Sequence, residues 1–230
     1  MIDVHTHILP FVDDGSDSVE KSIDLVKNSV KNGVSQIILT PHYKCGIYEN
    51  ERDELLEKFN SFVSEIKNRE IDVQLYLGEE VFCDNRIYKL LEQKKVLTIN
   101  NTNYLLIEFD YFNYSDIVDY AYNIMQMGYI PVIAHIERYK YLDANTLIEL
   151  HALGAKIQIN APSVIGDYGK KFQNRVFAAI KSGLVDFVAT DAHVNRESSL
   201  LSAHKVLTKK FGIKVANDLL INNAKIFFNE

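Results

Sequence analysis

The 230-residue sequence has no long apolar run, no excess of positive charge and only two cysteines. A membrane helix needs about 20 consecutive apolar residues, so we expect no membrane insertion. The first residues lack the basic and apolar segments of a secretory signal, which favours a mature, cytoplasmic protein. A hydrophobic content of 47% with 24% charged residues is typical of a globular protein, and a single domain over residues 1–230 accounts for the length.

The net charge of −6 argues against broad nucleic-acid binding, because such binding needs a basic face that displaces counterions from phosphates. Cys45 and Cys83 form no closely spaced pair of the metal-binding or redox kind. Two free thiols fit a cytoplasmic protein better than a disulfide, which the sequence alone leaves open.

Short apolar runs alternate with helical patterns along the whole chain, as expected for parallel strands joined by helices. Seven such units without a linker favour a closed barrel over an open sheet, so we predict an α/β fold, a distorted TIM-like (β/α)₇ barrel. The predicted strands lie at 2–5, 35–40, 72–77, 103–108, 130–134, 155–159 and 185–190. The predicted helices lie at 16–33, 50–68, 84–94, 115–127, 143–153, 169–182 and 197–211, with a final short helix from Lys214.

Histidines and carboxylates recur where these apolar runs end. In a parallel barrel the strand ends meet at one rim, so these side chains can face one centre. Residues i and i+2 of an extended segment point the same way, whereas Glu79 and Asp13 are expected to face away from the ligands beside them. A carboxylate can bridge two cations, which suits Glu80 or Asp191. The candidate metal ligands are His5, His7, Asp14, His42, Glu80, Glu108, His135, Asp191 and His193.

An ordered set of short motifs resembles the polymerase-and-histidinol-phosphatase (PHP) superfamily. The motifs are His5-Thr6-His7, Thr40-Pro41-His42, Gly78-Glu79-Glu80, Leu106-Ile107-Glu108-Phe109, Ala134-His135-Ile136-Glu137-Arg138 and Thr190-Asp191-Ala192-His193. Within that superfamily, Val12-Asp13-Asp14-Gly15 and the stretch 135–139 resemble the manganese-dependent protein-tyrosine phosphatases encoded with bacterial capsule and exopolysaccharide genes. The similarity extends over nearly the whole chain.

This resemblance implies a barrel of the PHP type with three divalent cations, manganese first and iron, zinc or cobalt as alternatives. Arg138 matches an arginine that lies near the substrate phosphate in the family. Arg196 is the candidate for a second, although it follows the Asp-x-His motif more closely than is usual, and Asn160 is expected to support the ligands. The implied ligand sets are His5, His7, Glu80 and Asp191; Glu80, Glu108 and His135; and Asp14, His42 and His193.

The implied reaction is hydrolysis of phosphotyrosine monoesters by a metal-bridged hydroxide. The implied substrate is an autophosphorylating bacterial tyrosine kinase with a tyrosine-rich tail that controls capsular or exopolysaccharide synthesis. Cysteine catalysis is disfavoured, because neither cysteine is followed by an arginine after five intervening residues. A small-molecule phosphatase acting on histidinol phosphate and a catalytically dead scaffold barrel are the alternatives. The negative net charge disfavours a nuclease. The sequence does not determine whether the protein forms an oligomer.

Overall fold

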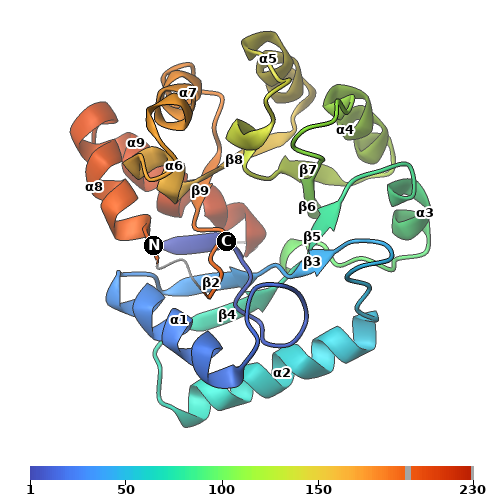
Figure 1. The fold of residues 1–230 in the computed structure, drawn as a ribbon, viewed down its shortest axis with the longest axis vertical. Coiled ribbons are helices and arrows are strands. Elements are labelled where there is room, and N and C mark those ends of the chain that lie inside the picture. Colours follow the sequence, from blue (N-terminus) through green and yellow to red (C-terminus); the bar gives the residue numbers. More distant parts are fainter. Residues whose placement is uncertain (195–197, 229–230) are drawn as a thin grey trace.

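The computed structural model describes residues 1–194 and 198–228, and its strands lie inside a ring of helices (Figure 1). The strands are β1 (Ile2–Thr6), β2 (Gln36–Leu39), β3 (His42–Tyr43), β4 (Gln74–Leu77), β5 (Glu80–Phe82), β6 (Tyr104–Glu108), β7 (Ile130–Ile133), β8 (Lys156–Asn160) and β9 (Phe187–Ala189). The helices are α1 (Val19–Lys31), α2 (Arg52–Asn68), α3 (Ile87–Glu92), α4 (Ile117–Gln126), α5 (Ala144–Leu153), α6 (Ala161–Ile165), α7 (Lys170–Lys181), α8 (Leu200–Phe211) and α9 (Ile213–Asn217).

All strand pairs are parallel, in the orders β1-β2-β4 and β3-β5-β6-β7-β8-β9. Strands β3 and β5 follow β2 and β4 directly in sequence after short interruptions, so the described strands correspond to the seven predicted units. The ring closes between β9 and β1, where the backbone N–H of Asp191 donates to His5 (3.0 Å) and that of His7 donates to Ala192 (2.9 Å). The predicted α/β barrel is confirmed.

The interruption between β4 and β5 depends on a glycine. A Cβ atom at Gly78 would lie 3.1 Å from the Cα of Ile99, so the backbone of the neighbouring turn packs directly against it. Past this point the chain re-enters the sheet, with the N–H of Glu80 donating to the carbonyl of Pro41 at 3.0 Å. The local geometry therefore places Glu80 at the start of a new strand near the carboxyl end of the barrel.

Alternate strand residues fill the barrel interior on the side of the polar strand ends that faces the amino end of the barrel. Val4, Ile38, Leu106 and Val132 form one buried cluster there, and Phe227 from the end of the chain packs into it. The opposite faces of the strands pack against the helices in a second, larger cluster. Apolar packing thus closes one end of the barrel and leaves polar side chains at the other. Among the described helices, none is long and apolar enough to span a membrane.

Helix α1 illustrates how local sequence sets these elements. The side chain of Ser18 accepts a hydrogen bond from the N–H of Lys21 and caps the helix, which buries Ile23 and Val26 on its inner face. The predicted helices are all present. Each of the seven begins one to three residues later than predicted, and three of them end at the predicted residue. The short α6, directly after β8, has no counterpart among the predictions, because its few residues carry no helical period.

Candidate metal centre

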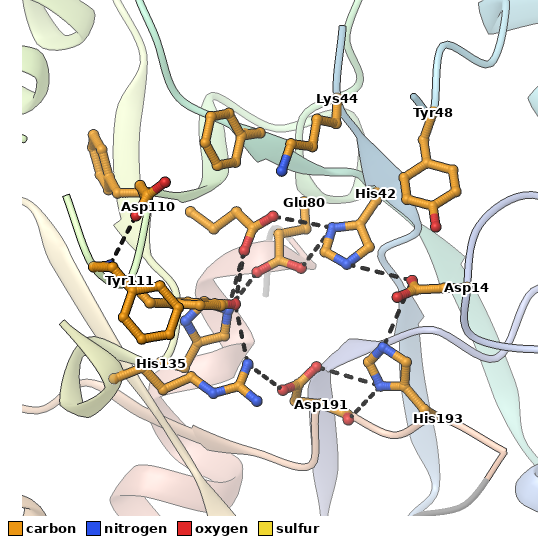
Figure 2. Close-up of a pocket in the computed structure, with 15 residues that line it drawn as sticks. Asp14, His42, Lys44, Tyr48, Glu80, Asp110, Tyr111, His135, Asp191 and His193 are labelled. Carbon is orange, nitrogen blue, oxygen red and sulfur yellow. Dashed lines mark hydrogen bonds and ion pairs between the residues drawn. The ribbon is translucent and has the colours of Figure 1, made fainter. Parts of the chain in front are cut away.

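The carboxyl ends of the strands surround a cavity of about 410 Å³ (Figure 2). The structure brings all nine predicted ligands to this place, with His5 and His7 fully buried beneath the cavity. Arg138 also lines the cavity, whereas Arg196 lies outside the described residues. The predicted ligands that line it are Asp14, His42, Glu80, Glu108, His135, Asp191 and His193.

Glu80 lies at the centre of this cluster. Its Oε2 atom is 3.1 Å from Nε2 of His5, 3.2 Å from Nε2 of His7 and 3.2 Å from Nδ1 of His42. Its Oε1 atom is 2.7 Å from Nε2 of His135. Burial raises the pKa of Glu80, but the surrounding imidazoles outweigh burial and hold this pKa well below its ordinary value. The two oxygens therefore face different imidazoles, as a carboxylate shared between two cations would.

Glu108 faces the same centre from β6. Its Oε1 is 3.3 Å from Nδ1 of His42, and its Oε2 is 3.8 Å from Nε2 of His135. The hydroxyl of Tyr111 donates to Oε2 at 2.9 Å. Burial, together with the negative charge of Glu80, raises the pKa of Glu108 to about 8. A cation between these carboxylates would relieve their repulsion.

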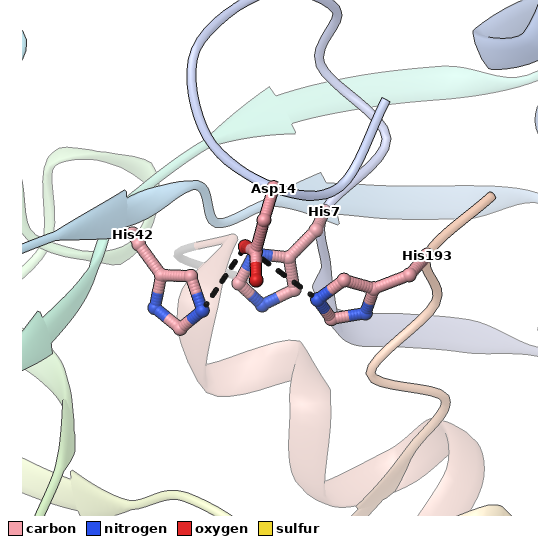
Figure 3. Close-up of side chains that lie close together, drawn as sticks. All are labelled: His7, Asp14, His42 and His193. Carbon is pink, nitrogen blue, oxygen red and sulfur yellow. Dashed lines mark ion pairs between the residues drawn. The ribbon is translucent and has the colours of Figure 1, made fainter. Parts of the chain in front are cut away.

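A second group of possible ligands surrounds Asp14 (Figure 3). Its Oδ1 is 3.6 Å from Nε2 of His42 and 3.9 Å from Nε2 of His193. The ring of His7 stacks on His193 with centroids 4.3 Å apart. Nitrogen or oxygen atoms of His7, Asp14, His42 and His193 lie close enough together to hold one ion. His7 thus belongs to this group as well as to the group with His5 and Glu80, whereas the implied ligand sets placed it only in the latter.

The acceptors beside the Nδ1 atoms of His5 and His7 indicate tautomers that suit cation binding. Nδ1 of His7 donates to Asp13 at 2.7 Å, and Nδ1 of His5 donates to Oε1 of Gln158 at 3.2 Å. With these protons on Nδ1, the Nε2 lone pairs of both rings, 3.1 Å apart, face Oε2 of Glu80. Ligands placed about 2.1 Å from one ion lie about 3 Å apart. The spacing of these electron-rich atoms therefore matches that of ligands around a divalent cation.

Asp13 and Gln158 hold the ligands in place and were not predicted to do so. The expectation that Asp13 faces away from the site is wrong, since its side chain also accepts from the backbone N–H of His42 at 2.9 Å. Burial raises the pKa of Asp13, but His7 outweighs it and lowers this pKa to about 2. Oε1 of Gln158 accepts from the N–H of His135 at 2.7 Å as well as from His5.

Two other neighbours behave as predicted. Glu79 points away from the imidazoles, because its Oε2 accepts from the backbone N–H of Leu97 at 2.6 Å, and burial raises its pKa to about 8. Nδ2 of Asn160 donates to Oδ2 of Asp191 at 2.9 Å, the supporting contact expected from its position at the end of a strand.

The backbone turns sharply at two proposed ligands. His135 and Asp191 have φ angles of 33° and 54°, in the left-handed region that few non-glycine residues adopt. Asp191 and His193 therefore do not form the plain extended segment that we assumed, and Nδ1 of His193 donates to the carbonyl of Asp191 at 2.9 Å. Such strain is characteristic of functional sites, where the surrounding structure enforces it.

Arg138 lies on a turn directly after His135. Its Nη1 atom is 3.3 Å from Oδ2 of Asp191 and donates to the hydroxyl of Tyr111 at 3.1 Å. The side chain remains 24% exposed, so the guanidinium is accessible from the cavity. Tyr111 thereby connects the cation of Arg138 to the carboxylate of Glu108.

Asp13→Ala is expected to weaken metal binding by about 10- to 100-fold, the usual effect of removing the carboxylate that orients a metal-ligating histidine. Titration of the metal-free protein with Mn²⁺ would measure this change. Asp17→Ala is the matched control, because Asp17 belongs to the same segment but pairs with Lys21 on the surface. Equal Mn²⁺ affinities in the two folded variants would contradict the role of Asp13.

A parallel α/β barrel with clustered histidines and carboxylates at its carboxyl end is typical of metal-dependent barrel hydrolases. Sequence comparison adds a narrower assignment. The chain belongs to the CpsB/CapC family of capsular polysaccharide synthesis, which it matches over residues 1–229. This membership agrees with the resemblance given by the motifs.

Individual relatives cover almost the whole chain. Tyrosine-protein phosphatase CpsB of Streptococcus agalactiae is 34% identical over 98% of this chain and 97% of its own length. Tyrosine-protein phosphatase YwqE of Bacillus subtilis is 32% identical over 99% of this chain and 94% of its own length. Among solved structures, one chain from the crystal structures of YwqE from Bacillus subtilis and CpsB from Streptococcus pneumoniae, described as metal-dependent tyrosine phosphatases, matches with a TM-score of 0.92 and 31% identity, covering 100% of this chain and 95% of that chain.

Proposed function

We propose that this chain is a metal-dependent protein-tyrosine phosphatase acting in capsular or exopolysaccharide synthesis. The observation that carries the proposal is the cluster of histidine nitrogens around the two oxygens of Glu80, at the floor of a cavity that Arg138 lines. Membership of the CpsB/CapC family supports the substrate class, since the relatives CpsB and YwqE are named as tyrosine-protein phosphatases.

The cluster would hold three divalent cations, with manganese as the expected metal. Imidazole and carboxylate donors also accept iron, zinc or cobalt, so the donor set alone does not select among them. Such cations lower the pKa of water towards neutrality and neutralise charge on phosphoryl oxygens. The proposed ligand sets are His5, His7, Glu80 and Asp191; Glu80, Glu108 and His135; and Asp14, His42 and His193. The geometry also brings His7 close to the third set and His42 close to Glu80 and Glu108 of the second.

The residues of the cavity wall bind and orient the substrate. The guanidinium of Arg138 faces the phosphate, and its contacts with Asp191 and Tyr111 fix its direction. A tyrosinate leaving group has a phenol pKa near 10, well below that of an alcohol, so it departs without a strong general acid. Arg196 remains a proposed second arginine that lies outside the described residues.

Neither cysteine is suited to act as the nucleophile. Both are free thiols, and Cys83 is buried. Burial raises the pKa of Cys83 well above its ordinary value and also raises the pKa of Cys45, so both remain protonated thiols at neutral pH. Nucleophilic cysteines instead have lowered pKa values.

The proposed physiological substrate is an autophosphorylated bacterial tyrosine kinase with a tyrosine-rich tail, and the proposed location is the cytoplasm. The family's role in capsular polysaccharide synthesis supports this partner. The cavity opens to the surface, which suits a phosphotyrosine on a flexible chain segment.

A substrate panel tests the proposed function directly. The Mn²⁺-loaded protein would be assayed on a phosphotyrosine peptide, on histidinol phosphate and on a dinucleotide. We expect the phosphotyrosine peptide to give the highest kcat/KM by a wide margin. Preferential hydrolysis of histidinol phosphate would replace the proposed function with a small-molecule phosphatase, and no activity on any substrate would favour the scaffold alternative.

Arg138→Ala is expected to lower kcat/KM on the phosphotyrosine peptide by roughly 10²-fold, about 2.7 kcal/mol, as for other donors that stabilise a transition state. Metal content, measured by elemental analysis, should not change, because an always cationic guanidinium is not a ligand. Arg86→Ala is the matched control, since Arg86 pairs with Asp84 away from the cavity lining.

The same assay tests the cysteines. Cys45→Ser and Cys83→Ser should turn over at close to the wild-type rate if water is the nucleophile. Full activity in Arg138→Ala, or an inactive cysteine variant that is folded and loaded with metal, would contradict the proposed mechanism.

A further inference from the structure

A second cationic side chain enters the cavity from the side away from Asp191. Figure 2 shows Lys44 pointing into the cavity, with Asp191 on the far side. Arg138 pairs with Asp191, so the two cations approach the cavity from opposite sides. Lys44 is the residue directly after β3, whereas Arg138 follows β7, so the two side chains come from different parts of the barrel.

The backbone holds Lys44 firmly. Its N–H donates to the carbonyl of Tyr48 at 2.7 Å, and the N–H of Tyr48 donates back to the carbonyl of Lys44 at 2.8 Å. The ammonium lies 4.1 Å from the centroid of the Phe82 ring, a cation–π contact that orients it without neutralising it. Both Tyr48 and Phe82 also line the cavity.

No described carboxylate forms a direct ion pair with the Lys44 ammonium, although Asp84, Glu108 and Asp110 lie near enough to interact with its charge. Lys44 forms no ion pair with any described residue, whereas Lys21, Lys58 and Lys156 each pair with an acidic side chain. Arg138 differs in this respect, because Asp191 already offsets part of its charge. Lys44 shares the lining of the cavity with the proposed ligands Glu80 and Glu108.

We infer that Lys44 is a second phosphate-binding residue, whose ammonium contacts the phosphoryl oxygens of the substrate from the side opposite Arg138. The inference rests on the proposed function and names a further residue of the same site. A phosphate dianion brings two negative charges into the cavity. Lys44 offers it a positioned donor that no protein carboxylate occupies, and hydrogen bonds to charged groups are the strongest of their kind.

Binding of inorganic phosphate to the Mn²⁺-loaded protein tests this inference without turnover. Lys44→Met retains the length of the side chain and removes the charge, and we expect it to raise the Kd for phosphate about tenfold, by the loss of one charge-assisted hydrogen bond. Lys44→Arg retains the charge and should bind phosphate within about threefold of the wild type. Calorimetric titration measures both values, and elemental analysis confirms equal metal content.

Lys140→Met is the matched control. Lys140 also contacts an aromatic ring, with its ammonium 5.0 Å from the centroid of Phe112, but it is exposed and does not line the cavity. The variant has the same change of charge and should bind phosphate like the wild type. An equal loss in Lys140→Met would show that only net charge matters and would overturn the inference.

Substrates of different size separate a phosphate contact from a contact with flanking residues. Lys44→Met should raise KM by similar factors for phenyl phosphate and for a phosphotyrosine peptide. An unchanged phosphate Kd, or a defect confined to peptides with acidic residues beside the phosphotyrosine, would overturn the inference. If the wild type binds phosphate through Lys44 but does not hydrolyse phosphotyrosine, the proposed function fails and the phosphate contact remains.

Discussion

Complete removal of divalent cations is expected to reduce phosphatase activity to below about 1% of the loaded protein, and added Mn²⁺ should restore it. A loss of this size corresponds to at least about 2.7 kcal/mol of barrier, which is less than cations contribute when they both activate water and neutralise phosphate. The five histidines and four carboxylates of the cluster are assigned to catalysis only as metal ligands, so activity should depend on the metal. Activity after dialysis against a chelator, then against each metal in turn, measures the effect.

Metal removal should also lower the stability of the fold. Cations at about 1,000 times their Kd stabilise a protein by about 4 kcal/mol, which corresponds to roughly 10 °C in Tm for a chain of this size. Thermal unfolding with and without Mn²⁺ gives the shift, and elemental analysis should find three ions per chain. Active protein that contains only trace metal would refute the metal-dependent mechanism.

Replacing Glu80 with glutamine is expected to empty at least one metal site and to lower kcat by roughly 10³-fold, about 4 kcal/mol. The amide keeps the shape of the side chain but removes the negative charge at the centre of the cluster. Oε2 of Glu80 lies within 3.2 Å of three imidazole nitrogens, so no neighbouring carboxylate can take its place. Elemental analysis and turnover, measured on the same preparation, should fall together.

Glu79→Gln is the matched control for this variant. Glu79 is the preceding residue and is equally buried, but it accepts a hydrogen bond from Leu97 away from the imidazoles. A glutamine oxygen can accept the same bond, and burial already raises the pKa of Glu79 to about 8, so little charge is lost at neutral pH. Similar losses in Glu79→Gln and Glu80→Gln would contradict the central position assigned to Glu80.

The sequence predicts the barrel well because its strands are short apolar runs and its helices are amphipathic. It does not reveal β3 and β5, since each follows another strand after only a two-residue interruption, Thr40-Pro41 or Gly78-Glu79. Both interruptions matter for the site, because they set the positions of His42 and Glu80. A periodic pattern cannot locate such breaks, which depend on packing between distant segments such as Gly78 against Ile99.

Gln158 and Asp13, which orient the ligands, could not be predicted from the sequence for similar reasons. Gln158 lies in the middle of β8, so a search for polar residues at the ends of strands does not identify it. Asp13 reaches His7 because its loop folds back, with Gly15 so close to His7 that a Cβ atom there would lie 2.0 Å from the His7 carbonyl oxygen. Alternation of side chains applies only to strands, and this loop is not one.

The closure of the barrel between β1 and β9 has a consequence for biosynthesis. His5 and His7 are synthesised well before their backbone partners Asp191 and Ala192, which lie more than 180 residues further along the chain. Contacts of such high sequence separation slow folding, although doubling the length of the closed loop costs only about 0.6 kcal/mol. An incomplete nascent chain therefore cannot bring the two halves of the centre together. The complete ligand cluster therefore requires a chain that extends at least to His193, the last of the candidate ligands in the sequence.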